Sequence, residues 1–229
     1  MSRIFKNVNL FRMYMNEEFN FINMMRKSYS YYCLYSSRSN KKVKVIHNWI
    51  KNILEHKLGD NYLVFTDKNI PALNASGRKN TDIVVFNKKT QTYDLAICVK
   101  FVCSNYKQNK NNYLENIIGE TCTIKAMNPN IKVVSFNIFP SKCPYFKKNG
   151  DIKKIEDINY EKDLAVYHKH SNKYYYDLAI MYLLDIDYTN NNVIGLNKDT
   201  PYIPFDQILT QLNFFQSITT NIKPIISSF

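Results

Sequence analysis

Residues 81–101, TDIVVFNKKTQTYDLAICVKF, constrain the fold of this chain more than any other stretch. Two apolar runs, DIVVF and DLAICVKFV, flank a polar segment, which is typical of two strands joined by a hairpin. The hairpin would bring Asp82 on the first strand and Lys100 on the second to the same end of a sheet. Positions 98 and 100 share one face because side chains alternate along a strand.

Apolar spacing on both sides of this hairpin predicts helix, strand, strand, strand, helix, strand over about residues 43–139. The stretch YDLAIMYLLDID is apolar throughout and fits either a strand or a buried helix. Residues 152–168 and the segment after Pro204 are predicted to be helical. The expected class is therefore α/β (α+β), with a helical C-terminal part. The expected elements are helices near 45–58 and 108–127 and strands near 61–66, 82–87, 94–102 and 131–138.

The N-terminal segment carries apolar residues at spacings of three and four, which predicts a long amphipathic helix. A Tyr-rich stretch that follows, SYSYYCLYSSRSNKK, is interpreted as a linker. The helix must cover its apolar face, either on a neighbouring subunit or on the C-terminal half of its own chain. The residues that form this face are Ile4, Val8, Phe11, Met15, Phe19, Ile22 and Met25.

The chain is strongly basic, with 31 Lys and Arg against 19 Asp and Glu and a formal charge of +12. Such a surface favours phosphate backbones, although lysine-rich usage in an AT-rich gene explains the charge equally well. The five cysteines form no CxxC pair, so we expect free thiols rather than a zinc site. Without an apolar signal core or membrane-length run, we expect an intracellular protein with no membrane partner, in host cytoplasm or nucleus if viral.

Three stretches, GRKNTDIVVF, DLAICVKFV and SNYKQNKNNYLENIIGET, resemble the PD-(D/E)XK nuclease superfamily, most of all its type II restriction endonuclease branch. The resemblance implies a restriction-endonuclease-like αβββαβ core and Mg²⁺-dependent cleavage of DNA. Carboxylates would hold Mg²⁺, and a lysine would orient the water and steady developing charge. It also implies three parts: 1–41, the helix and Tyr-rich linker; 42–145, the nuclease-like core; and 146–229, an extension packed on the core.

Position 98 departs from the family pattern, because Cys98 stands where an acid is expected two residues before Lys100. A thiol is a soft ligand and a poor partner for Mg²⁺. The resemblance implies that the missing carboxylate comes from the following helix, with Glu120 preferred over Glu115. Asp82 and Glu120 would then hold the metal, and Lys100 would act on the water. Glu55 is set aside because it points away from its helix's apolar stripe.

Two functions remain open at this level. The first is a Mg²⁺-dependent DNA endonuclease whose basic loops, FNKKTQT and NYKQNKNN, contact phosphates. The second is a structural, self-assembling protein on a decayed nuclease fold, such as a viral occlusion-body protein. In that case residues 1–30 would contact other subunits in a homo-oligomer or lattice, and no metal would be needed.

Overall fold

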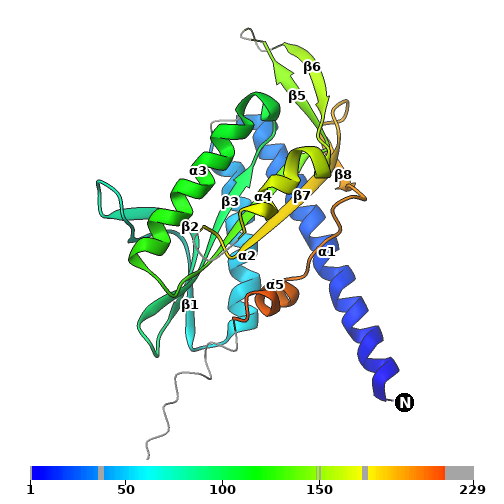
Figure 1. Cartoon of the computed structure of the whole chain (residues 1–229). Helices are drawn as coiled ribbons and strands as arrows, with labels where there is room; N and C mark the ends of the chain where they lie inside the picture. The colour runs from blue at the N-terminus through cyan, green and yellow to red at the C-terminus, as the bar shows by residue number, and fades with distance from the viewer. Residues whose placement is uncertain (1, 36–38, 148, 150, 172–174, 215–229) are drawn as a thin grey trace, which may run out of the picture.

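A computed structural model describes residues 2–214 except 36–38, 148, 150 and 172–174, and only the backbone of residues 2–15. Its centre is a six-stranded mixed sheet in the order β1-β2-β3-β4-β7-β8, with helices on both faces (Figure 1). The α/β expectation is therefore confirmed. The strands are β1 (Tyr62–Pro71), β2 (Arg78–Asn87), β3 (Thr92–Phe101), β4 (Lys132–Pro140), β7 (Leu178–Asp187) and β8 (Asn192–Leu196).

The two central pairs, β3 with β4 and β4 with β7, are parallel, whereas the outer pairs are antiparallel. The parallel β3–β4 connection runs through α3 (Tyr106–Met127), as a parallel pair requires a crossover. The predicted neighbours, 82–87 and 94–102, do pair, from Ile83 opposite Ile97 onward. A separate two-stranded ribbon, β5 (Lys142–Phe146) with β6 (Ile152–Asp157), extends beyond the sheet (Figure 1).

Helices cover the two faces unequally. One face carries α1 (Ser2–Tyr35), α2 (Lys41–Leu58) and α5 (Phe205–Gln211). The other face carries α3, a π-helical turn (Tyr160–Leu164) and α4 (Ala165–Lys169). Strand alternation divides β3 between them: Ile97 and Val99 pack on the α2 side, and Cys98 packs on the α3 side.

The expectation of a helical C-terminal part is wrong. The stretch YDLAIMYLLDID supplies β7, which lies inside the sheet, and β8 follows it. A parallel strand covered on both faces is apolar throughout, so it lacks the alternation that would have marked it as a strand. Residues 152–157 form β6 rather than a helix, and only 160–169 and 205–211 of the described C-terminal residues are helical.

The Tyr-rich segment is also not a linker, because α1 continues through it to Tyr35. Phe21, Met25 and Tyr29 are buried in the core of their own chain. This half of the helix therefore docks within the chain, although Phe19 is 61% exposed. The start of α1 extends away from the sheet (Figure 1).

Contact between subunits through residues 1–30 stays a prediction. The side chains of Ile4, Val8, Phe11 and Met15 lie outside the described residues. A truncation that tests it must stop before Phe21, because removal of the buried residues beyond that point would damage the core itself.

Candidate metal centre and catalytic site

Asp82 lies in a fork between β2 and β3. The ladder between these strands starts at Ile83 and Ile97. Beyond this first pair, the Val99 backbone N–H donates a hydrogen bond to the carboxylate of Asp82 (Oδ2, 2.7 Å). The side chain therefore occupies the gap between the strands, with 25% of its surface exposed. This position gives Asp82 access to groups on both sides of the sheet.

Asp67 on β1 faces Asp82 across the antiparallel pair. Thr66 pairs with Ile83 and Lys68 with Thr81, so the register places Asp67 opposite Asp82. Asp67 has a φ of 51°, in the left-handed region that costs a non-glycine residue about 1–3 kcal/mol. Two carboxylates at opposed positions also repel each other. The fold therefore holds two unfavourable features at one point, which is typical of a functional site.

The side chains of β1 change sides of the sheet between Val64 and Ile70, the interval that contains Asp67. Val64 packs on the α2 side of the sheet, whereas Ile70, six residues later, packs on the α3 side. In a regular strand, two residues separated by an even number would share a face. The reversal lies between them, where Asp67 stands.

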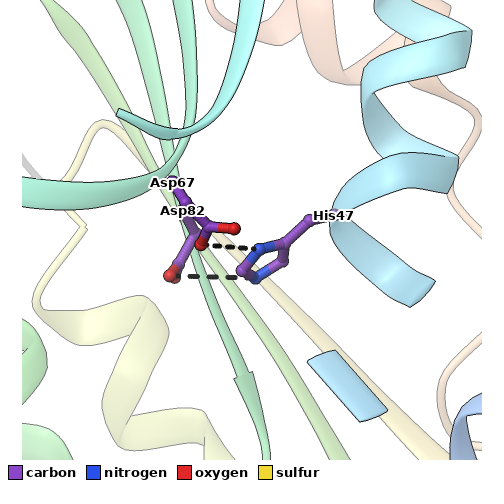
Figure 2. Close-up of side chains that lie close together, drawn as sticks. All are labelled: His47, Asp67 and Asp82. Carbon is purple, nitrogen blue, oxygen red and sulfur yellow. Dashed lines mark ion pairs between the residues drawn. The ribbon is translucent and has the colours of Figure 1, made fainter. Parts of the chain in front are cut away.

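His47 on α2 completes the group (Figure 2). Its Nδ1 lies 3.4 Å from Asp67 Oδ1, and its Nε2 lies 3.7 Å from Asp82 Oδ1. The ring is 3% exposed, and neither nitrogen has a hydrogen bond to any described residue. One ligand atom from each of the three side chains lies within 4.8 Å of the others.

These three residues fit a divalent cation. Buried polar atoms without hydrogen bonds are rare in folded proteins, and two facing carboxylates require a neighbouring positive charge. A cation bound by one ring nitrogen of His47 and by the carboxylates of Asp67 and Asp82 would supply this charge and give that nitrogen a partner. Carboxylates alone suit Mg²⁺, whereas an imidazole ligand is more usual for transition metals, so the set favours Mn²⁺ over Mg²⁺.

Glu120 on α3 bridges two lysines at the same end of the sheet. Its Oε2 lies 3.2 Å from Lys100 Nζ and its Oε1 lies 3.4 Å from Lys79 Nζ. Glu120 is 9% exposed, whereas Lys100 and Lys79 are 31% and 36% exposed, so water reaches the lysine side of both ion pairs. Glu115 lies exposed on the rim of the adjoining cavity, and Glu55 pairs with Lys51 on the far side of α2.

The site residues influence one another's ionisation. Burial raises the pKa of Asp82, and His47, the Val99 N–H and Lys100 oppose this effect in part. Burial alone would lower the pKa of Lys100, but Glu120 and Asp82 outweigh it and raise that pKa. Lys100 is therefore held as an ammonium ion, suited to stabilising negative charge rather than accepting a proton.

Cys98 lies beneath this group with 1% of its surface exposed. Burial raises the pKa of its thiol well above the ordinary value, and Glu120 and Asp82 add to the effect. The side chain is thus a neutral thiol packed among Val84, Ala96 and other apolar residues on the α3 side. Such a thiol does not replace a carboxylate as a ligand.

Contact of the two basic stretches with phosphates stays a prediction. FNKKTQT forms the β2–β3 hairpin, at the opposite end of β2 from Lys79 and five residues beyond Asp82. The second stretch is not a loop but forms the start of α3, where Lys107 and Lys110 pair with Asp163 at 3.8 and 3.4 Å. The described lysines that border the site cavity are instead Lys79 and Lys100.

His47 and Asp67 were missed in the sequence. His47 lies three residues before Ile50 and seven before Leu54, and therefore on the buried stripe of α2. A histidine within an apolar stripe that faces a sheet was the available signal. Asp67 carried no such signal, because its role depends on the register of β1 and β2.

Comparison with family models, curated proteins and solved structures finds no match for this chain. Among the described residues, no helix combines the length and apolar character needed to cross a membrane.

The raised pKa of Asp82 has a consequence for stability. Its folded-state pKa lies above the unfolded value, so ionisation costs stability as pH rises through the folded pKa. We expect Asp82→Asn to raise the melting temperature of the metal-free protein at pH 7 by about 2 °C or more. The gain should vanish near pH 3, where the carboxyl is protonated in both states. Calorimetry in a chelator measures this, with exposed Asp60→Asn as the control.

A wild-type protein as stable as Asp82→Asn at pH 7 would contradict the electrostatic account of this site.

Proposed function

We propose that this chain is a metal-dependent nuclease that hydrolyses phosphodiester bonds in DNA. One observation carries the proposal: His47, Asp67 and Asp82 converge within ligand distance of one another, and Asp82 interacts with the protonated Lys100 beside them. Metal-binding carboxylates next to a lysine are the groups that phosphodiester hydrolysis requires.

Each residue has a defined role in this proposal. A bound divalent cation would polarise the phosphate and make water more acidic. His47, Asp67 and Asp82 hold the cation, and the Val99 N–H fixes the orientation of Asp82. Lys100 neutralises charge that develops on the phosphate, because the neighbouring acids keep it protonated.

Glu120 acts on the lysines rather than on the cation. It binds Lys79 and Lys100 in the absence of substrate and so holds both ammonium groups at the site. A phosphate that reaches these lysines competes with Glu120 for the same donors. This role differs from the metal-ligand role expected for Glu120 from the family resemblance.

We further propose that the chain is a divergent member of the PD-(D/E)XK superfamily, related to the type II restriction endonuclease branch. The order α2, β1, β2, β3, α3, β4 supports this, as does the position of Asp82 and Lys100 at adjoining strands. Asp67 would supply the second carboxylate that Cys98 cannot provide. This relationship rests on the order of elements and on the acid–lysine pair, and it does not by itself require a duplex substrate.

The test is cleavage by the full chain of linear, supercoiled and single-stranded DNA, with Mn²⁺, Mg²⁺ or chelator. We expect cleavage with metal, faster with Mn²⁺ than with Mg²⁺, and none with chelator. Absence of cleavage under all conditions, together with no Mn²⁺ binding, would overturn the proposal. That result would favour the alternative, a self-assembling protein on a decayed nuclease fold.

A further inference from the structure

We infer that the site accepts a single nucleic-acid strand, in a groove that crosses the end of β3 and stacks a base on Tyr113. This inference rests on the proposed function, since it names the form of substrate for the same site. The inference is based on two adjoining hollows, on the side chain of Tyr113 and on the charges around it.

The two hollows share Lys100 and Tyr113. The larger, of about 500 Å³, lies between α3 and the β2 end of the sheet and is bordered by Lys79, Asn116 and Glu120. The smaller, of about 240 Å³, lies toward the start of α2 and is bordered by Lys42 and Ser104. Because Lys100 and Tyr113 border both, the two hollows adjoin at the end of β3, and this groove meets the site at Lys100 and Glu120 rather than at the three candidate metal ligands.

Tyr113 is suited to stacking because its position is fixed. Its ring lies parallel to that of Tyr106, with an interplanar angle of 11° and centroids 6.1 Å apart. Tyr106 is fully buried and its hydroxyl donates to the Asp163 carbonyl at 3.0 Å, so it forms a rigid support. Tyr113 itself is half-buried and borders the groove. Aromatic rings at such positions bind bases without regard to sequence.

The charges along the groove match a phosphate backbone. Lys79 and Lys100 border the larger hollow, and Lys100 also borders the smaller one, whose described lining residues include no acid. Lys42 borders the smaller hollow as well, but it is 8% exposed and its ammonium lies 5.1 Å from the centre of the Tyr32 ring. Glu120 offsets part of this charge in the larger hollow, with Glu115 on the rim. Lysines that follow a strand on either side of an aromatic ring are typical of single-strand binding.

A duplex does not satisfy this arrangement. In a duplex the base faces are stacked on one another, and only base edges are open in the grooves. A base can stack on Tyr113 only when it no longer stacks on its neighbouring bases. In an unpaired strand this requires no separation of two strands. DNA and RNA share the base and phosphate chemistry used here, so both are candidate strands.

Fluorescence anisotropy on the full chain in chelator tests this without any cleavage. The probes are a labelled mixed-sequence 12-nucleotide DNA strand, the RNA of the same sequence, and the DNA duplex. We expect at least about tenfold tighter binding of a single strand than of the duplex, and the two strands show which sugar is preferred. Tyr113→Ala should weaken strand binding about tenfold, whereas Tyr113→Phe should retain it.

Charge variants give a second readout. Lys79→Gln should weaken binding and lower the slope of log affinity against log salt by about 0.7. Lys89→Gln removes the same charge from the exposed β2–β3 hairpin and should change neither quantity. Equal or tighter binding of the duplex, or unchanged binding by a folded Tyr113→Ala protein, would overturn the inference.

The two proposals fail separately. Strand binding without cleavage in any metal would refute the nuclease proposal alone. Metal-dependent cleavage of duplex that is unaffected by Tyr113→Ala would refute the single-strand groove alone.

Discussion

Asp82→Asn is expected to abolish metal-dependent cleavage, with a loss of at least about 10³-fold in rate. Asp82 lies 3.7 Å from His47, accepts a hydrogen bond from the Val99 N–H and interacts electrostatically with Lys100. Asparagine keeps the shape of the side chain and can still accept from Val99. It removes the charge that would hold the cation. Single-turnover cleavage with Mn²⁺ in excess is the measurement.

Misfolding cannot account for this loss if the variant is more stable than wild type in chelator, as expected above. Exposed Asp60→Asn serves as the matched control and should cleave at the wild-type rate. Residual cleavage within tenfold of wild type would show that Asp82 does not hold an essential cation.

Lys100→Gln is expected to lower the cleavage rate by about 10²-fold or more, with a smaller effect on substrate affinity. Lys100 is held as an ammonium ion next to Asp82, so its charge acts where negative charge develops on the phosphate. Because it does not accept a proton, the remaining activity should keep the wild-type pH profile. Steady-state rates over pH 6–9 measure both effects.

Lys89→Gln, on the hairpin at the other end of β2, is the matched control for charge. Equal losses in the two variants would mean that Lys100 acts only through general attraction of the substrate. A changed pH profile in Lys100→Gln would mean that Lys100 does take part in proton transfer.

The pairing of β2 with β3 could be predicted because both segments contain short apolar runs and a polar turn joins them. The predicted pairing was sufficient to place Asp82 and Lys100 at the same end of the sheet. The apolar spacing of α3 also favoured Glu120 over Glu115 as the acid nearer the sheet, but it predicted a metal-ligand role for Glu120 rather than its ion pair with Lys100. Local periodicity was sufficient for these features.

The ligand group could not be derived in the same way. His47 and Asp82 are 35 positions apart and meet only because α2 packs across the sheet at one angle. Asp67 depends on a left-handed residue inside a strand, which a non-glycine sequence does not reveal. β7 was undecided because a strand buried on both faces has no period.

Position 98 explains why the sequence analysis looked for the second acid on α3, and the metal-ligand role of Glu120 stays a prediction. The family pattern places an acid on β3, and its absence directed attention to α3, where Glu120 was already bound by two lysines. The structure offers a carboxylate from the other side, because β1 is the antiparallel partner of β2 and presents Asp67. Cys98 then serves packing alone.

The most direct test is anomalous X-ray scattering from a crystal of the full chain soaked in Mn²⁺. We predict one strong peak about 2.1 Å from a ring nitrogen of His47 and from carboxylate oxygens of Asp67 and Asp82. The peak should be absent in a crystal of Asp82→Asn. A wild-type crystal with no peak at this position, or with the ion held by Glu115 and Glu120 instead, would contradict the assignment of the metal centre.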